Sequence, residues 1–167
     1  MQFFNISPRK RTNIDFMAFE IERKFLVKDH SYVAMADSAK TIRQAYLSTR
    51  PESTVRVRTV DKCGFLTVKS KNIGAIRHEW EYEIPYDDAI EMMSNCAVTP
   101  VIEKIRYNVG LWEIDEFRNS LSGLTIAEIE LKDENEKIAI PEFIGEEITG
   151  DSRYYNSVIA MTGKIPD

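Results

Sequence analysis

Charged and apolar residues alternate along most of the chain, which is the period of a β-strand. In residues 20–27, Glu20, Glu22 and Lys24 fall on one face, and mostly apolar side chains fall on the other. Seven later segments repeat this pattern, at residues 41–48, 54–60, 65–70, 77–84, 101–109, 111–117 and 124–131. Pro, Gly and polar residues in the connections favour hairpins, so we expect an antiparallel meander.

Helical spacing is limited to short segments. Residues 87–97 and 152–161 are expected to form helices, residues 29–36 a short helix or turn, and residues 141–145 a loop. The fold class is therefore α+β, mainly β. Because eight antiparallel strands can close around one small ligand, we predict a closed eight-stranded antiparallel β-barrel with a few short helices outside. Trp80, Tyr82, Trp112 and Ile114 are expected to pack against these helices on the outer face.

Length and charge fit a single domain that does not bind nucleic acid. The 167 residues, 43% of them hydrophobic, are ample for one core. Residues 1–17 lack periodicity and are expected to be a flexible N-terminal extension, followed by one domain over residues 18–167. A net charge of -5 argues against a nucleic-acid surface, which normally carries a basic excess. Any bound anion must therefore meet basic groups that are gathered locally.

The cysteines and the lack of long apolar runs indicate in which cellular compartment the protein is expected. Cys63 and Cys96 do not have the spacing of a zinc site or a disulfide framework, which favours free thiols in a reducing cytoplasm. No apolar run approaches the length needed to cross a bilayer. We expect a cytoplasmic protein with no membrane partner. Its oligomeric state stays open, a dimer included.

Alternation alone leaves open whether the charged faces meet bulk water or an enclosed cavity. The segment from Glu20 to Lys24 resembles the ExExK signature of the CYTH domain family, the triphosphate tunnel metalloenzyme superfamily. Later segments look like the same family in the same order, at residues 43–47, 55–58, 66–70, 77–81, 103–107, 112–115, 128–130 and 145–149. The resemblance covers about residues 18–162 and is strongest to the small bacterial inorganic triphosphatases.

This resemblance implies a tunnel with the charged faces inward, where a triphosphate group and a divalent cation bind. Unpaired ions are costly in a low-dielectric interior, so the two signs must balance there. The basic residues at the charged positions are Lys24, Arg43, Arg56, Arg58, Lys69, Arg77, Lys104 and Arg106. The acidic residues are Glu20, Glu22, Glu79, Glu81, Asp115, Glu128 and Glu130.

The two sets of residues suit two tasks. Guanidinium forks match phosphate oxygens, and carboxylates are hard donors suited to Mg²⁺ or Mn²⁺. The resemblance implies substrate binding by Lys24, Arg43, Arg56, Arg58, Lys69, Arg77 and Arg106. It implies metal binding by Glu20, Glu22, Glu128 and Glu130, with Asp115 as a further ligand or a group behind them. Glu79 and Glu81 rank lower, as holders of a second cation or of a water.

Metal and arginines together would expose the terminal phosphorus to in-line attack by water. The proton acceptor is either a glutamate of the first strand, such as Glu22, or Lys104 with a lowered pKa, and the sequence does not choose between them. Tyr46 matches a tyrosine of the family. It either assists catalysis or packs in the core, where tyrosines are often half buried.

These residues predict metal-dependent hydrolysis of a phosphoanhydride. The expected substrate is inorganic tripolyphosphate, cleaved to pyrophosphate and phosphate, with nucleoside triphosphates as poorer substrates. Two alternatives remain: a class IV adenylyl cyclase that converts ATP to cyclic AMP, and a non-catalytic polyphosphate-binding module. Product analysis separates the first alternative from hydrolysis, and binding without turnover would identify the second.

Overall fold

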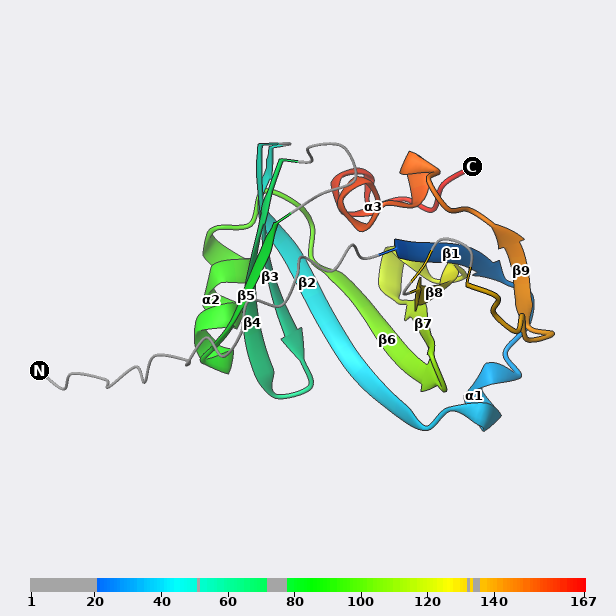
Figure 1. Ribbon diagram of the computed structural model, residues 1–167. Helices are drawn as coiled ribbons and strands as arrows, with labels where there is room; N and C mark the ends of the chain where they lie inside the picture. The colour runs from blue at the N-terminus through cyan, green and yellow to red at the C-terminus, as the bar shows by residue number, and fades with distance from the viewer. Residues whose placement is uncertain (1–20, 51, 72–77, 132, 134–135) are drawn as a thin grey trace, which may run out of the picture.

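The computed structural model describes residues 21–50, 52–71, 78–131, 133 and 136–167 and contains one antiparallel sheet (Figure 1). The expected N-terminal extension lies outside these residues. The strands are β1 (Ile21–Val27), β2 (Ser38–Arg50), β3 (Ser53–Val60), β4 (Cys63–Ser70), β5 (Glu79–Ile84), β6 (Ile102–Val109), β7 (Trp112–Phe117), β8 (Thr125–Leu131) and β9 (Ile144–Glu147). They are hydrogen-bonded in the order β5-β4-β3-β2-β6-β7-β8-β1-β9. The mainly β, antiparallel architecture expected from the alternation is thus confirmed.

Strand β9 falls where the sequence predicts a loop. It is four residues long, too short for alternation to reveal, and it pairs with β1. Gly145 allows the close approach, because a Cβ at this position would lie 2.9 Å from the carbonyl oxygen of Leu26. The loop prediction was therefore wrong for the second half of that segment.

The sheet curves into a trough but does not close through hydrogen bonds. Within the described part of the chain, β5 pairs with β4 alone and β9 with β1 alone. In Figure 1, β3 to β5 form one side, β7, β8 and β1 form the other, and β2 and β6 lie between them. Helix α3 (Asn156–Thr162) lies in the opening. The prediction of a closed eight-stranded barrel is not confirmed, because neither edge strand is paired across the opening with any strand of the described residues.

The remaining helices are short. They are α1 (Tyr32–Met35), α2 (Tyr86–Asn95) and the 3-10 turns η1 (Asn119–Leu121) and η2 (Ser152–Tyr154). None of the helices in the described residues is long and apolar enough to span a membrane. They cover apolar faces of the sheet and leave the charged face to the inside.

Apolar side chains form separate core clusters around the trough. Helix α2 packs Ala89 and Met93 against Ala45 and Val57 of the outer face. A second cluster joins α1 to the outer face of β1, β7 and β8 and includes Trp112 and Ile114, as expected. Helix α3 belongs to a third cluster, at one end of the trough.

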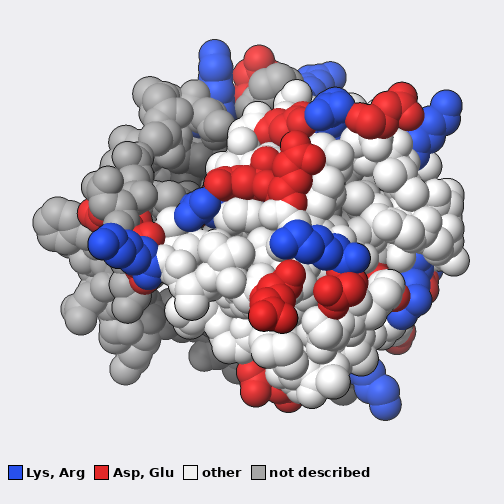
Figure 2. All heavy atoms as spheres, turned by 90° about the vertical axis from the view of Figure 1, so that its right-hand side faces the viewer, with Lys and Arg blue, Asp and Glu red and all other residues white. Residues whose placement is uncertain are grey.

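The two aromatic residues of edge strand β5 differ from expectation. Trp80 and Tyr82 are 41% and 56% exposed and belong to none of these clusters, so the prediction that they pack against helices was wrong. Helix α2 covers β2, β3 and β4, and β5 lies at the margin of that contact. On the β9 side, the outer surface carries acidic and basic side chains beside one another (Figure 2). Inside the trough, Glu22, Glu113, Glu128 and Glu130 lie on β1, β7 and β8, and Arg56, Arg58 and Lys69 lie on β3 and β4.

Candidate active site

The charged faces of the strands line one cavity of about 900 Å³. Cross-strand partners in an antiparallel sheet share a face, and the register places Glu22 opposite Glu130 and Gln44 opposite Arg58. The lining residues come from β1 to β8, the β6–β7 turn and the start of α3: Glu22, Lys24, Gln44, Tyr46, Thr54, Arg56, Arg58, Lys69, Glu79, Lys104, Arg106, Asn108, Gly110, Leu111, Glu113, Glu128, Glu130, Leu131, Tyr155, Asn156 and Ser157. The charged faces therefore converge on one lumen, as the tunnel resemblance implies.

Carboxylates of β1, β7 and β8 form an acidic wall, which consists of Glu22, Glu113, Glu128 and Glu130. Lys24 lies within it: its Nζ is 3.0 Å from Oε2 of Glu22 and 2.5 Å from Oε1 of Glu128. Burial raises the pKa of Glu22, and the nearby Glu128 carboxylate raises it further. The ammonium of Lys24 thus holds together two carboxylates that would otherwise repel each other.

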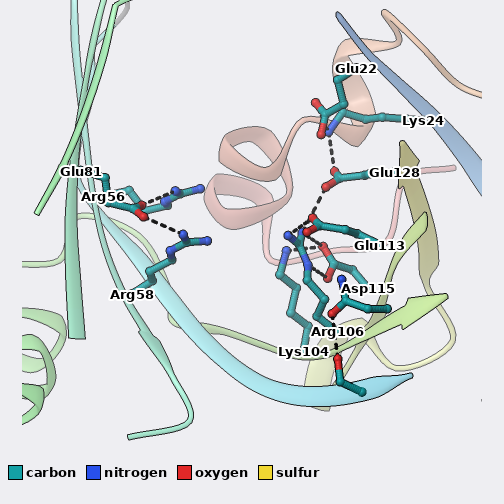
Figure 3. Close-up of polar contacts among 12 residues, drawn as sticks. Glu22, Lys24, Arg56, Arg58, Glu81, Lys104, Arg106, Glu113, Asp115 and Glu128 are labelled. Carbon is teal, nitrogen blue, oxygen red and sulfur yellow. Dashed lines mark hydrogen bonds and ion pairs between the residues drawn. The ribbon is translucent and has the colours of Figure 1, made fainter. Parts of the chain in front are cut away.

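Beside this wall, two cations of β6 share one buried carboxylate (Figure 3). Lys104 Nζ lies 2.5 Å from Asp115 Oδ2, and the two side chains are only 2% and 1% exposed. The Arg106 guanidinium donates from Nε and Nη2 to Asp115 at 2.7 and 2.6 Å, and it also pairs with Glu113 and Glu128. Asp115 is therefore an anchor for the two cations, and it is not among the residues that line the cavity.

Burial and ion pairing shift the pKa values of this group in opposite directions. Burial lowers the pKa of Lys104, since the charged ammonium loses its hydration. Burial alone would raise the pKa of Asp115, but the charges of Lys104 and Arg106 and their hydrogen bonds outweigh it and lower the pKa to about 2. The Asp115 carboxylate is consequently ionised throughout the neutral range.

Arg56, Arg58 and Lys69 of β3 and β4 form a basic wall on the other side of the cavity, and Figure 3 shows the two arginines of this wall. Glu81 of β5 accepts from Arg56 Nη2 at 3.5 Å and from Arg58 Nη2 at 3.0 Å. The fully buried Thr67 donates to Glu81 at 2.7 Å and accepts from Arg56 at 3.2 Å. The arginines are therefore held at their Nη2 ends.

Glu79 is the ion-pair partner of Lys69, as Glu81 is the partner of Arg56 and Arg58. Its carboxylate lies 2.5 Å from Lys69 Nζ. Burial of Glu81 would raise its pKa, but the hydrogen bond from Thr67 and the charges of Arg58 and Arg56 lower it overall. Glu79 and Glu81 thus serve as partners of the basic wall in this structure, whereas the sequence suggested that they hold a second cation or orient a water.

Most of the predicted site residues reach this cavity, and a few do not. Arg43 lies on the opposite face of β2 from Gln44, and its Nε is 3.8 Å from Glu103. Glu20 and Arg77 fall outside the described residues. Tyr46 lines the cavity and is 6% exposed, which is compatible with either of its expected roles.

Several polar residues of the site were not selected from the sequence. These are Gln44, Thr54, Thr67, Asn108 and Glu113. The period of two could have identified two of them, because Gln44 precedes Tyr46, and Glu113 precedes Asp115, by two positions on the same strand. Gln44, Thr54, Thr67 and Asn108 are neutral and escaped a search that was based on charge, whereas Glu113 is charged and was not assigned a role.

The donor chemistry of the acidic wall fits a divalent cation. Among the described residues, no group of three or more His, Cys, Asp or Glu side chains is arranged as a metal site. However, Glu22, Glu128 and Glu130 offer carboxylate oxygens to one cavity from two neighbouring strands, and Mg²⁺ and Mn²⁺ prefer such ligands. The ammonium of Lys24 supplies the positive charge that a cation would supply to Glu22 and Glu128.

Comparison with known proteins identifies the family. The sequence model of the CYTH domain matches residues 18–156. An inorganic triphosphatase of Acetivibrio thermocellus is 45% identical over 145 residues, which cover 84% of this chain and 92% of the relative. An inorganic triphosphatase of Nitrosomonas europaea is 35% identical over 151 residues, covering 86% and 97%.

Solved structures share the fold. A crystal structure of an inorganic triphosphatase superposes with a TM-score of 0.65 at 33% identity, covering 89% of this chain and 97% of that one. A Hippeastrum protein, described as an adenylyl cyclase with a dominant triphosphatase activity, gives 0.52 at 15% identity over 68% of this chain and 80% of its own, so it supports the fold alone. With a family model that spans most of the chain and a cavity of the expected chemistry, the chain belongs to the CYTH domain family.

Proposed function

We propose that the protein is a divalent-metal-dependent inorganic triphosphatase, which hydrolyses tripolyphosphate to pyrophosphate and phosphate. The observation that carries this proposal is one cavity in which an acidic wall and a basic wall face each other. A metal–triphosphate complex brings a cation for the first wall and phosphate oxygens for the second. Two relatives of 45% and 35% identity, both named inorganic triphosphatase, support the same substrate class.

The basic wall binds the phosphate chain. Guanidinium groups donate in a planar fork that matches two phosphate oxygens, and Arg56 and Arg58 are held by Glu81 with their Nε groups unpartnered among the described residues. Lys69 adds a point charge. On β6, Lys104 and Arg106 extend the cationic surface toward the acidic wall. Substrate binding is therefore shared by β3, β4 and β6, with Lys24 on β1.

The acidic wall holds the metal. Glu22, Glu128 and Glu130 would ligate Mg²⁺ or Mn²⁺, and the bound ion would offset the charge of the phosphate oxygens during attack. Glu20 of the same signature lies outside the described residues and is proposed as a further ligand from the sequence alone. Asp115 keeps Lys104 and Arg106 in place from behind, and Tyr46 stays a candidate for assisting the reaction.

Hydrolysis requires one proton transfer. The water oxygen bonds to the terminal phosphorus, the bridging P–O bond breaks, and pyrophosphate leaves with the electron pair. Of the two candidate bases, Glu22 fits better, because it lines the cavity and its side chain is 42% exposed, so that it can accept the proton that the attacking water loses. Lys104 Nζ already donates to Asp115, so it acts as a fixed cation.

The test is a substrate panel. Phosphate release from tripolyphosphate, ATP and thiamine triphosphate is measured with Mg²⁺, with Mn²⁺ and with EDTA. We expect the highest kcat/KM on tripolyphosphate and no turnover in EDTA. Cyclic AMP formed from ATP, with tripolyphosphate left intact, would overturn the proposal in favour of a cyclase. Tight binding of tripolyphosphate without turnover in either metal would favour a binding module.

A Glu22→Gln variant tests the acidic wall. Because the amide cannot serve as an anionic ligand or as a base, we expect activity to fall at least a hundredfold while the fold is retained. The matched control is Glu103→Gln, the same chemical change on the outer face of β6, where the Glu103 carboxylate lies 3.8 Å from Arg43 Nε. Unchanged activity in Glu22→Gln would remove Glu22 from the site.

A further inference from the structure

A neutral amide lines the cavity among the charged side chains. Gln44 of β2 is 2% exposed and belongs to the lining residues. Its Nε2 is buried and has no hydrogen-bond partner among the described residues. A carboxamide nitrogen carries two donors, and buried donors in folded proteins are nearly always bonded. This nitrogen therefore calls for an acceptor that the described chain does not supply.

The register shows what kind of acceptor fits. Gln44 lies directly opposite Arg58 on β3, and Tyr46 lies opposite Arg56. Directly opposed side chains share a face and have Cβ atoms about 5 Å apart. On its other side, Gln44 lies opposite Ile102 of β6, whose side chain offers no acceptor. The amide thus belongs to the basic wall by position, although it carries no charge.

The arginines beside it have unpartnered donors of the same kind. Nε of Arg56 and Nε of Arg58 are buried and lack partners among the described residues, since Glu81 accepts only from their Nη2 groups. Figure 3 shows both guanidiniums reaching from this wall toward the opposite one. Together with Gln44, neighbouring strands thus present buried N–H donors for which the described residues supply no acceptor. A phosphate group, which offers acceptors on every side, meets this requirement.

We propose that Gln44 is a substrate-binding residue, whose Nε2 donates a hydrogen bond to a phosphate oxygen of the bound triphosphate beside Arg58. This inference rests on the proposed function and adds to it a neutral donor. Gln44 contributes direction without charge: it fixes the phosphate relative to Arg58 and leaves the charge balance of the cavity unchanged. The competing explanation is an amide that fills space in the wall and meets a water.

Two substitutions separate these explanations. Gln44→Met keeps the length and unbranched shape but removes the donors, and Gln44→Glu keeps the shape but replaces the donors with a carboxylate that repels phosphate. We expect kcat/KM for tripolyphosphate with Mg²⁺ to fall about ten- to hundredfold in Gln44→Met, the size of one hydrogen bond to a charged acceptor. The fall should be larger in Gln44→Glu. A merely structural amide predicts the opposite order, because Gln44→Glu could pair with Arg58.

The control is Thr59→Val, which removes a buried hydroxyl from the opposite face of β3, directly after Arg58. It should leave kcat/KM unchanged. A kcat/KM within twofold of the wild type in Gln44→Met, or in Gln44→Glu if Gln44→Met does not fold, overturns the inference while the proposed function stands. If the wild type itself does not hydrolyse tripolyphosphate, the proposed function and this inference fall together.

Discussion

The acidic wall and the basic wall of the cavity differ in how far the chain satisfies its own polar groups. In the acidic wall, Lys24 and Arg106 already neutralise Glu128, which is 9% exposed at its side chain. In the basic wall, Glu81 engages Arg56 and Arg58 at one end only, and their Nε donors stay without partners among the described residues. In the first wall, Glu22, Glu113 and Glu128 are thus ion-paired to cations of the chain, whereas the second has buried donors without partners among the described residues.

This difference suggests how a ligand enters. Phosphate oxygens can meet the reserved donors of the basic wall without breaking an existing pair. A metal ion, in contrast, must compete with the Lys24 ammonium for Glu22 and Glu128. Lys24 released by the metal would then be available to a phosphate oxygen in the same cavity. Metal and triphosphate should therefore favour each other's binding, because the triphosphate offers a new partner to the Lys24 ammonium that the metal displaces.

The largest effect on stability is expected behind the acidic wall. Asp115→Asn would leave Lys104 and Arg106 without their shared carboxylate at a site only 1% exposed. Removing one partner of a buried ion pair costs about 3–5 kcal/mol, so the free energy of unfolding in urea should fall by that amount. Glu103→Gln on the outer face should cost far less. A loss below about 1 kcal/mol in Asp115→Asn would mean that the network does not depend on Asp115.

Substitutions in the basic wall should lower the activity more than the stability of the fold. Arg58→Lys keeps the charge but removes the planar fork, so we expect kcat/KM for tripolyphosphate to fall about tenfold to a hundredfold. Arg43→Lys is the matched control, because Arg43 lies on the opposite face of β2 and does not line the cavity. Equal losses in both variants would show that Arg43 also reaches the substrate, as its place in the family pattern implies.

Alternation predicted the strands well, but not which of two positions on the inward face meets the cavity. Asp115 and Glu113 share a face of β7 with the same period, yet Asp115 is buried behind Lys104 and Arg106 whereas Glu113 lines the lumen. A period of two shows on which face of a strand a side chain lies, but it does not show how deeply that side chain is buried. Depth depends on the curvature of the sheet and on the lengths of the facing side chains.

The edges of the sheet could also not be predicted from the sequence. Strand β9 contributes four residues, fewer than a period-two pattern needs, and its approach to β1 depends on a glycine. The exposed Trp80 and Tyr82 follow from the position of β5 at the other edge. Arg43 was predicted to bind substrate because its segment resembles a segment of the family. Its alternation with Gln44 and Tyr46 already indicated that it lies on the opposite face of β2.

A smaller effect should appear on acidification. The pKa of Asp115 is about 2, against an ordinary value of 3.8, so its ion pairing stabilises the fold above pH 4 and is lost as the pH falls toward 2. The shift corresponds to about 2 kcal/mol in the free energy of unfolding. Urea unfolding at several pH values should show a steeper decline in the wild type than in Asp115→Asn. Parallel declines would contradict the low pKa.

The smallest loss of stability is expected for a change at Arg23, which precedes Lys24 and lies on the outer face of β1. Arg23 donates from Nε and Nη2 to both carboxylate oxygens of Glu147 on β9, at 2.8 and 2.6 Å, but the two side chains are 31% and 40% exposed. Solvent and salt screen such a pair, so Arg23→Gln should lower the free energy of unfolding by less than about 1 kcal/mol, and salt should weaken the difference. Lys24→Met, in the buried pair on the inner face, should cost more. If Arg23→Gln proved as costly as Lys24→Met, then attachment of the edge strand β9, and not burial, would determine which ion pairs stabilise this sheet.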